Sequence, residues 1–148
     1  MSDHFSVDEL TFSSTAQRLG IDNTPSDAIL LNLQILMAGL EKVRSVLGNV
    51  PMKIDSGYRC EALNEAIGGA PASAHLQGLA ADFLAPEFGV PVDVVAAIVH
   101  NKEAIRFHRV IQEGTWTHID FPPAGQAPAY LVLTAHFGPG GTTYSTGA

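Results

Sequence analysis

A long segment in which apolar residues keep helical spacing is the feature that most constrains the fold. Between residues 24 and 48, six apolar residues recur at intervals of three and four: Ile29, Leu33, Leu36, Leu40, Val43 and Leu47. This spacing predicts one amphipathic helix with Thr24 as its N-cap, Pro25 as its first helical residue and Gly48 at its end. Its first half carries further apolar side chains on other faces: Leu30, Leu31, Ile35 and Met37. We expect such a helix to be buried on several sides, so other elements must pack around it.

Shorter helices are predicted before and after this segment. Ser6 and Glu9 fit a capping box, which predicts a helix that ends near Leu19–Gly20. The glycine and proline signals divide the later part of the chain into three segments: a turn and short helix at residues 57–69, a loop at 70–78, and a helix at 90–101 with Pro91 in its first turn.

Short strands are predicted mainly in the second half of the chain. Alternating or briefly continuous apolar residues mark five of them, at residues 51–56, 79–85, 107–113, 116–121 and 129–137. Gly114 and Thr115 are sufficient for a hairpin turn between the third and the fourth. Helices first and strands last predict an α+β fold, in which N-terminal helices pack on a small, largely antiparallel sheet. Because the linkers are too short for two domains, we expect a single domain over residues 1–148.

Composition excludes several classes of protein and site. The formal net charge is −7, from 8 basic and 15 acidic residues, so nucleic acid and anionic lipid should be repelled. The only cysteine, Cys60, excludes an intrachain disulfide and a cysteine-based zinc site. No basic region followed by an apolar run opens the chain, and no 18-residue apolar run occurs. We therefore expect a monomer that is made in the cytoplasm without a signal peptide and does not insert into a membrane.

The stretch SAHLQGLAAD, residues 73–82, contains the first residues that could carry chemistry. His75 falls at the end of a loop and Asp82 in the following strand, and the small residues between them let the backbone bring the two together. Imidazole and carboxylate are both good ligands for zinc. The alternative is an ordinary loop histidine and a strand carboxylate.

His118 supplies a third ligand candidate. By strand alternation His118 shares one face with Trp116 and Asp120. This arrangement suits a metal-binding histidine with a substrate-binding wall beside it. The alternative is a histidine at the edge of the core, hydrogen-bonded to a carbonyl. The other four histidines lack a matching carboxylate motif and are expected to be structural or solvated: His4, His100, His108 and His136.

Three protein ligands leave the fourth position of a catalytic zinc to water, and a hydrolase then also needs a base and an oxyanion donor. Glu113 is the candidate base because it precedes the turn into the His118 strand; it could also be an ordinary hairpin glutamate. Arg59 follows a strand through a glycine turn and is the candidate donor, although it could instead pair with Glu61. Asp120 is the rival base, but it lies roughly 7 Å beyond His118 along the strand, which favours orientation of a neighbouring side chain.

Three segments in this order resemble the zinc D-Ala-D-Ala carboxypeptidases and L-alanyl-D-glutamate endopeptidases, which share the hedgehog/DD-peptidase fold and include bacteriophage endolysins. They are SGYR, LNEAIGGAPASAHLQGLAADF and WTHID. The family pattern is matched at the following positions: Ser73, His75, Gly78, Ala80 and Asp82, and later Trp116 and His118. The opening FSVDELTFSSTAQRLGIDNTP is similar to the phage and prophage branch, so the resemblance runs from about residue 5 to TTYSTG.

The resemblance implies one zinc ion per chain, bound by His75, Asp82 and His118. It also implies that Arg59 polarises the scissile carbonyl and that Ser73 holds substrate, with Trp116 as a substrate-binding wall. Several relatives carry the base three residues before the last histidine, where this chain has Thr115. Glu113 lies two residues earlier and would reach the water from a different turn geometry, which the resemblance implies for an upstream glutamate in the phage branch.

Two hypotheses for the function follow. The first is a zinc peptidase, endolysin-like, whose partner is a peptidoglycan stem peptide and which acts on the cell wall after phage-mediated release. The second is a non-catalytic metal-binding or virion-structural module with the same fold, because fold alone does not establish hydrolysis. Three ligands, an arginine and a nearby glutamate favour the enzyme.

Overall fold

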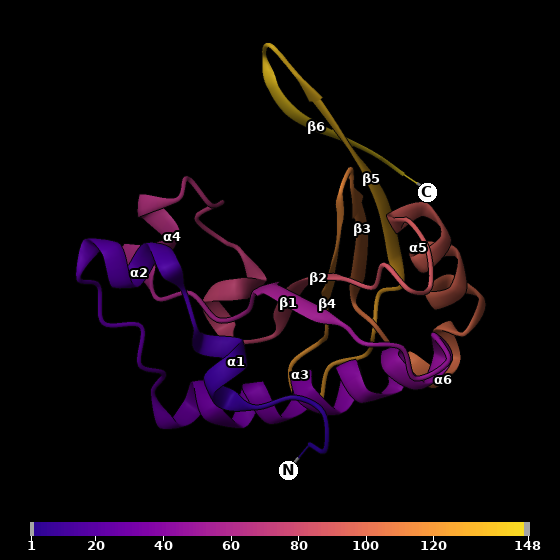
Figure 1. The fold of residues 1–148 in the computed structure, drawn as a ribbon, viewed down its shortest axis with the longest axis horizontal. Coiled ribbons are helices and arrows are strands. Elements are labelled where there is room, and N and C mark those ends of the chain that lie inside the picture. Colours follow the sequence, from indigo (N-terminus) through magenta and orange to yellow (C-terminus); the bar gives the residue numbers. More distant parts are fainter. Residues whose placement is uncertain (1, 147–148) are drawn as a thin grey trace.

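The computed structural model describes residues 2–146 and has one mixed sheet flanked by helices (Figure 1). Within these residues the strands are β1 (Lys53–Ser56), β2 (Ala80–Leu84), β3 (Arg109–Glu113), β4 (Trp116–Asp120), β5 (Leu131–Gly138) and β6 (Gly141–Thr146). Their order is β1-β2-β4-β3-β5-β6, and only the β3–β5 pair is parallel. The predicted α+β class with a largely antiparallel sheet is confirmed, as is the hairpin turn between β3 and β4.

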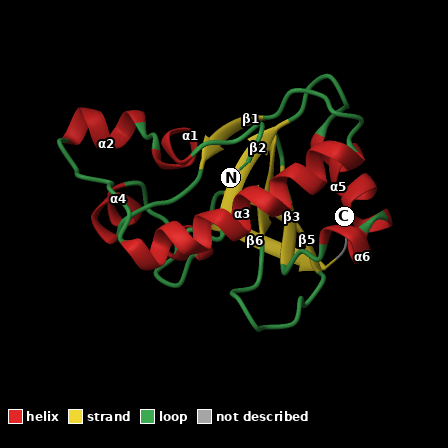
Figure 2. Cartoon of the chain, turned by 90° about the horizontal axis from the view of Figure 1, so that it is seen from below, coloured by secondary structure: helices red, strands yellow, loops and turns green. Residues whose placement is uncertain are grey.

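The longest helix crosses one face of this sheet (Figure 2). The helices are α1 (Val7–Thr11), α2 (Ser14–Leu19), α3 (Asp27–Val46), α4 (Glu61–Ala66), the 3₁₀ helix η1 (Ala74–Gln77), α5 (Pro91–His100) and α6 (Lys102–Ile105). The buried side of α3 belongs to the main core cluster, together with α5 and the strands. Burial of this apolar surface is the main stabilising contribution to the fold.

The two faces of the sheet have different roles because side chains alternate along each strand. Phe83, Val110 and Ile119 are fully buried in the core with α3. Their neighbours Asp82 and His118 therefore point to the opposite face. The strand pairing places these two residues directly opposite each other, so the face away from α3 collects the polar side chains singled out by the sequence.

The predicted start of α3 is wrong by two residues. Its N-cap is Ser26, whose hydroxyl accepts a hydrogen bond from the Ile29 N–H. Thr24 instead donates its hydroxyl hydrogen to the Asp22 carboxylate at 2.6 Å, and its backbone N–H bonds the same oxygen. The competing acceptor at Asp22 therefore holds Thr24 in a local turn, and the helix begins after Pro25.

Three other predictions also need correction. The helix expected from Ser6 to about Gly20 is two helices, because Ser13 accepts the Ala16 N–H and starts a second one. The expectation that α3 is buried on several sides is wrong at Leu31, which is 65% exposed. The segment predicted as a loop at 70–78 contains the short helix η1.

The last strand was not predicted at all. Residues 141–146 are all exposed, are mostly threonine, serine and glycine, and carry no apolar alternation. They form a strand because they pair with β5, and Figure 1 shows this hairpin reaching beyond the other strands. Among the described residues, no helix has the length and apolar character needed to cross a membrane.

Candidate metal centre and active site

Three predicted ligands from separate elements meet on the face of the sheet away from α3. His75 lies in η1, Asp82 in β2 and His118 in β4, and one potential ligand atom from each lies within 4.8 Å of the others. All three residues are buried. The structure thus brings together a His-Asp-His group whose chemistry suits a divalent cation such as zinc.

The local sequence of η1 explains how His75 reaches this position. Ser73 caps the short helix by accepting the His75 N–H at 3.2 Å. Gly78 ends it with φ of 74°, a conformation that side-chain-bearing residues rarely adopt, and a Cβ there would press on Ile29. The chain therefore turns sharply from His75 into β2, which carries Asp82.

Each histidine has one ring nitrogen bound to an acceptor outside the group. His75 uses Nδ1 to contact the Gly57 carbonyl oxygen at 2.7 Å, so this nitrogen is the donor. His118 uses Nε2 to contact the Asp120 carboxylate at 2.7 Å. Such outer contacts fix the tautomer of a metal-binding histidine. They leave Nε2 of His75 and Nδ1 of His118 as the nitrogens that face Asp82.

The distances within the group fit one small cation. Nε2 of His75 lies 3.4 Å from one oxygen of Asp82, and Nδ1 of His118 lies 3.0 Å from the other. A tetrahedral zinc ion with ligands about 2.0–2.1 Å away requires neighbouring ligand atoms roughly 3.3–3.4 Å apart. The donor set and the fixed tautomers therefore fit zinc, and the distance between His75 and Asp82 matches the spacing that it requires.

Charge in the metal-free group is distributed unevenly. Burial disfavours a charged His118, but hydrogen bonds with Asp120 and Asp82 outweigh it and raise the pKa of His118 to about 9. Burial also opposes the charge on Asp82, yet hydrogen bonds from His118 and His75 hold the pKa of Asp82 well below its usual range. Burial lowers the pKa of His75 despite the nearby Asp82. An ionised carboxylate and a neutral imidazole are both ready to bind a cation.

Arg59 is held at the edge of the group by three hydrogen bonds. Its nitrogens contact Ser56 at 3.1 Å, Asn64 at 3.2 Å and Asp82 at 3.4 Å. The predicted alternative, a pair with Glu61, does not form. Burial lowers the pKa of Arg59, while the charges of Asp82 and Glu113 oppose this. A positive charge is therefore fixed beside the candidate metal position.

Glu113 shares a cavity with the metal group. It ends β3 directly opposite Trp116, and it is half-buried. Burial raises the pKa of Glu113, and the charge of Asp82 raises it further. A carboxylate with these properties is a stronger base than one in water, as proton transfer near neutral pH requires.

The rival carboxylate, Asp120, lies behind His118. It is 1% exposed, and its Oδ2 contacts both Nε2 of His118 and, at 3.0 Å, Nε of Arg109. It is absent from the lining of the cavity that holds Glu113. This is the orienting position expected for Asp120, although the identity of the base stays a prediction.

A cavity of about 450 Å³ contains nearly all of the predicted site residues. Those that line it are Arg59, Ser73, His75, Asp82, Glu113 and His118. Trp116 is the exception: its indole packs on Phe137, with ring centroids 6.2 Å apart, and its Nε1 is buried without a hydrogen-bond partner. Trp116 does not line this cavity, and its role as a substrate-binding wall stays a prediction.

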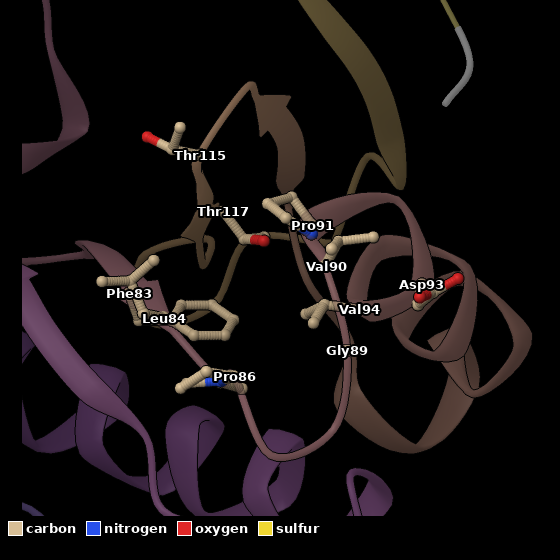
Figure 3. Close-up of a pocket in the computed structure, with 11 residues that line it drawn as sticks. Phe83, Leu84, Pro86, Gly89, Val90, Pro91, Asp93, Val94, Thr115 and Thr117 are labelled. Carbon is tan, nitrogen blue, oxygen red and sulfur yellow. The ribbon is translucent and has the colours of Figure 1, made fainter.

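A second cavity, of about 370 Å³, lies on the other side of β4 (Figure 3). Its lining is largely apolar, with Phe83, Pro86 and Val94 around it and Asp93 as its only ionisable residue. Thr115, which stands three residues before His118, lines this second cavity. A base at that position would need a different turn, so Glu113 is the better placed residue.

The four remaining histidines do not join a metal group within residues 2–146. His4 pairs with Glu41 at 2.7 Å, and His136 bonds the Ser145 hydroxyl at the same distance. His100 is exposed, and His108 has a buried Nδ1 without a hydrogen-bond partner. These positions agree with the structural or solvated roles expected for them.

Two polar residues in the lining of the first cavity, Arg109 and Tyr144, were missed by sequence reasoning. Arg109 lies on the same face of β3 as Glu113, four residues earlier, so counting back in steps of two would have found it. Tyr144 reaches the cavity from β6. No sequence signal marked Tyr144, because β6 itself lacks an alternating pattern.

Comparison with known proteins agrees with this geometry. No curated protein matches the chain significantly. A family model described as peptidase M15 matches residues 3–120, a range that includes all three members of the His-Asp-His group together with Arg59 and Glu113. Since this match covers most of the chain, the protein belongs to the peptidase M15 family.

Proposed function

We propose that this protein is a zinc-dependent peptidase that hydrolyses amide bonds in peptidoglycan stem peptides. The observation that carries the proposal is the buried His75–Asp82–His118 group, in which one potential ligand atom from each residue lies within 4.8 Å of the others. Membership of the peptidase M15 family supports it independently.

His75, Asp82 and His118 would hold the metal. When bound, zinc in such a site supplies Lewis acidity, which makes water nucleophilic at neutral pH and polarises a carbonyl group. Gly57 and Asp120 keep the two imidazole rings oriented through their outer nitrogens. Every ligand is thus fixed before substrate arrives, which lowers the cost of organising the site.

Glu113 and Arg59 would divide the remaining work. Glu113 accepts a proton from the attacking water and then donates it to the nitrogen of the leaving amine. Arg59 stabilises negative charge that develops on the carbonyl oxygen, because a guanidinium donates charge-assisted hydrogen bonds. Its contacts with Ser56, Asn64 and Asp82 hold it in place for this role.

The resemblance of the chain to D-Ala-D-Ala carboxypeptidases and L-alanyl-D-glutamate endopeptidases defines three candidate bonds. These are D-Ala-D-Ala, L-Ala-D-Glu and the D-Ala-diaminopimelate cross-link. Resemblance to the phage branch adds an endolysin role, with release to the cell wall through a pore made by another protein. One zinc ion per chain and a monomer complete the proposal.

Digestion of purified muropeptides, analysed by mass spectrometry, tests the proposal. The zinc-loaded protein should cleave one class of stem-peptide bond, chelator should abolish cleavage, and added zinc should restore it. Glu113→Gln should be nearly inactive, whereas Glu103→Gln, which alters an exposed glutamate on α6, should cleave normally. Zinc binding without cleavage of any muropeptide would favour the non-catalytic module instead.

A further inference from the structure

Arg109 brings a second guanidinium into the cavity, and this one has free donors. Its Nε contacts Asp120 at 3.0 Å, while its two terminal amino groups make no hydrogen bond to the residues that the structure describes. Its side chain is 34% exposed and lines the cavity. Arg59, by contrast, already uses one N–H of each of its three nitrogens, which leaves one N–H on each terminal nitrogen. Arg109 is therefore the cavity arginine whose two terminal amino groups are both open to a ligand.

The strand register places Arg109 next to the candidate metal position. Ile111 of β3 is directly opposite His118, and Arg109 is opposite Asp120. Arg109 is thus a diagonal neighbour of His118, at a spacing of about 7–8 Å that long side chains bridge. A group bound by Arg109 belongs to the part of a substrate immediately beside the bond held at the metal.

The stem peptide offers a group of matching chemistry at that place. In each of the three candidate bonds, the residue that contributes the amine carries an α-carboxylate that the peptide linkage leaves free. A planar guanidinium binds a carboxylate through two parallel hydrogen bonds, which gives both affinity and orientation. Arg59, the other arginine in the cavity lining, has one N–H left on each terminal nitrogen and is assigned to the carbonyl oxygen.

We propose that Arg109 binds the α-carboxylate of the amine-side residue of the scissile bond and so makes that free carboxylate a requirement for good substrates. This inference rests on the proposed function and narrows its substrate class. The alternative is a positioning role, in which Arg109 only holds Asp120 against His118. In that role, loss of Arg109 would weaken metal binding, and the protein would bind the free acid and the carboxamide equally well.

The test uses matched synthetic peptides for the three candidate bonds, each with the amine-side α-carboxylate either free or converted to a carboxamide. Binding to the zinc-loaded Glu113→Gln protein is measured by calorimetry, and hydrolysis by the zinc-loaded wild type is followed separately. At least one free acid should bind about 10–100-fold more tightly than its carboxamide, the range expected for a charge-assisted hydrogen-bonded pair.

Variants of Arg109 in the same background locate this preference. Arg109→Gln should bind acid and carboxamide equally well, and Arg109→Lys should retain part of the preference because it keeps the charge. Arg18→Gln, which removes an exposed arginine on α2, should retain all of it. Zinc affinity measured on each variant detects a positioning role, which would weaken metal binding and lower the affinity of both peptides equally.

Three results would overturn the role of Arg109: equal binding of acid and carboxamide by the Glu113→Gln protein in which Arg109 is intact, a preference that survives Arg109→Gln, or no binding of any free acid. The hydrolysis measurement reports on the other proposal. A preference for the free acid without cleavage by the wild type would reject the peptidase and leave the carboxylate site standing.

Discussion

His118 is the candidate metal ligand that holds a proton most strongly when no metal is bound. Both of its ring nitrogens contact carboxylates, Asp82 and Asp120, which favour the doubly protonated ring when no cation is present. A metal that binds here would have to replace the proton on the nitrogen that faces Asp82. Metal binding and protonation therefore compete at one atom.

This competition predicts a pH dependence of metal affinity. Zinc affinity should rise between pH 6 and pH 8, by up to about tenfold per unit, because the pKa of His118 in the metal-free protein is about 9. Calorimetric titrations in buffers of different ionisation enthalpy should detect about one proton released per zinc at pH 7.5. Affinity that is flat over this range would show that His118 does not compete with the proton for the metal.

The same pKa gives the opposite trend for stability of the metal-free protein. The folded pKa of about 9 lies above an unfolded value near 6.5. Charged His118 therefore stabilises the fold fully below about pH 6.5, and this contribution is lost as pH rises towards 9. The denaturant midpoint of the chelated protein should therefore fall as pH rises from about 6.5 to 9, because His118 loses its proton. His118→Gln should remove this fall.

Glu113 and Asp120 should be distinguishable by the step that each supports. Glu113→Gln should retain zinc and peptide binding while turnover falls about 10²–10⁴-fold, the usual contribution of acid–base catalysis. Asp120→Asn should lose less turnover when saturated with zinc, but its zinc affinity should fall about 10–100-fold because the outer contact of His118 weakens. Turnover and zinc dissociation constants measured on both variants decide this. If Asp120→Asn lost nearly all turnover while Glu113→Gln kept normal turnover, Asp120 would be the base.

At the scale of elements, strand alternation explains why so much of the site could be predicted. Alternation along β4 correctly grouped Trp116, His118 and Asp120 on one face, and the turn at 114–115 placed Glu113 near them. Alternation could not show that β5 is the other neighbour of β3. The β3–β5 pairing joins segments about twenty residues apart, so the part of the cavity lined by Leu133 and Tyr144 depends on tertiary contacts that no local pattern records.

Gly57 connects the first helix to the metal group. A Cβ on Gly57 would collide with the backbone carbonyl of Leu10, and the carbonyl oxygen of Gly57 accepts the hydrogen bond from His75. Gly57→Ala must push the two segments apart, because the obstacle is backbone and cannot rotate away. The contact that fixes the tautomer of His75 should be lost with it.

We therefore expect Gly57→Ala to lower the free energy of unfolding by about 1–3 kcal/mol, a typical cost of overpacking. Its zinc affinity should fall too. Gly138→Ala is the matched control, since a Cβ there meets no atom within 4 Å and its φ is outside the left-handed region. Urea denaturation and zinc titration of both variants provide the comparison, and equal stability of the two would contradict the proposed close contact.

For the molecule as a whole, the class of fold could be predicted while several boundaries could not. Helices first and strands last were sufficient for an α+β arrangement, because the sheet must cover the apolar side of α3. The start of α3 depends on a hydrogen bond from the Thr24 hydroxyl to Asp22, which keeps Thr24 from capping the helix. The strand β6 forms only because it pairs with β5. Both are decided by contacts whose strength the residue pattern does not reveal.

The metal should also stabilise the whole molecule, since its three ligands come from η1, β2 and β4. A ligand that binds only the native state stabilises it by mass action, about 2.7 kcal/mol at a free concentration a hundred times its dissociation constant. For a chain of this length that corresponds to a rise in Tm of about 5–10 °C. Chelation should reverse this rise, and added zinc should restore it.

His75→Ala separates the metal from other effects of the chelator. This variant should bind little or no zinc by metal analysis, and its Tm should be the same with and without chelator. The zinc-loaded wild type must lose its extra stability in the same solutions. If confirmed removal of zinc left the wild-type melt unchanged, the three elements would have to be held together by packing and by the Asp82 contacts with His75 and His118 alone. In that case zinc would contribute to catalysis and not to the stability of the fold.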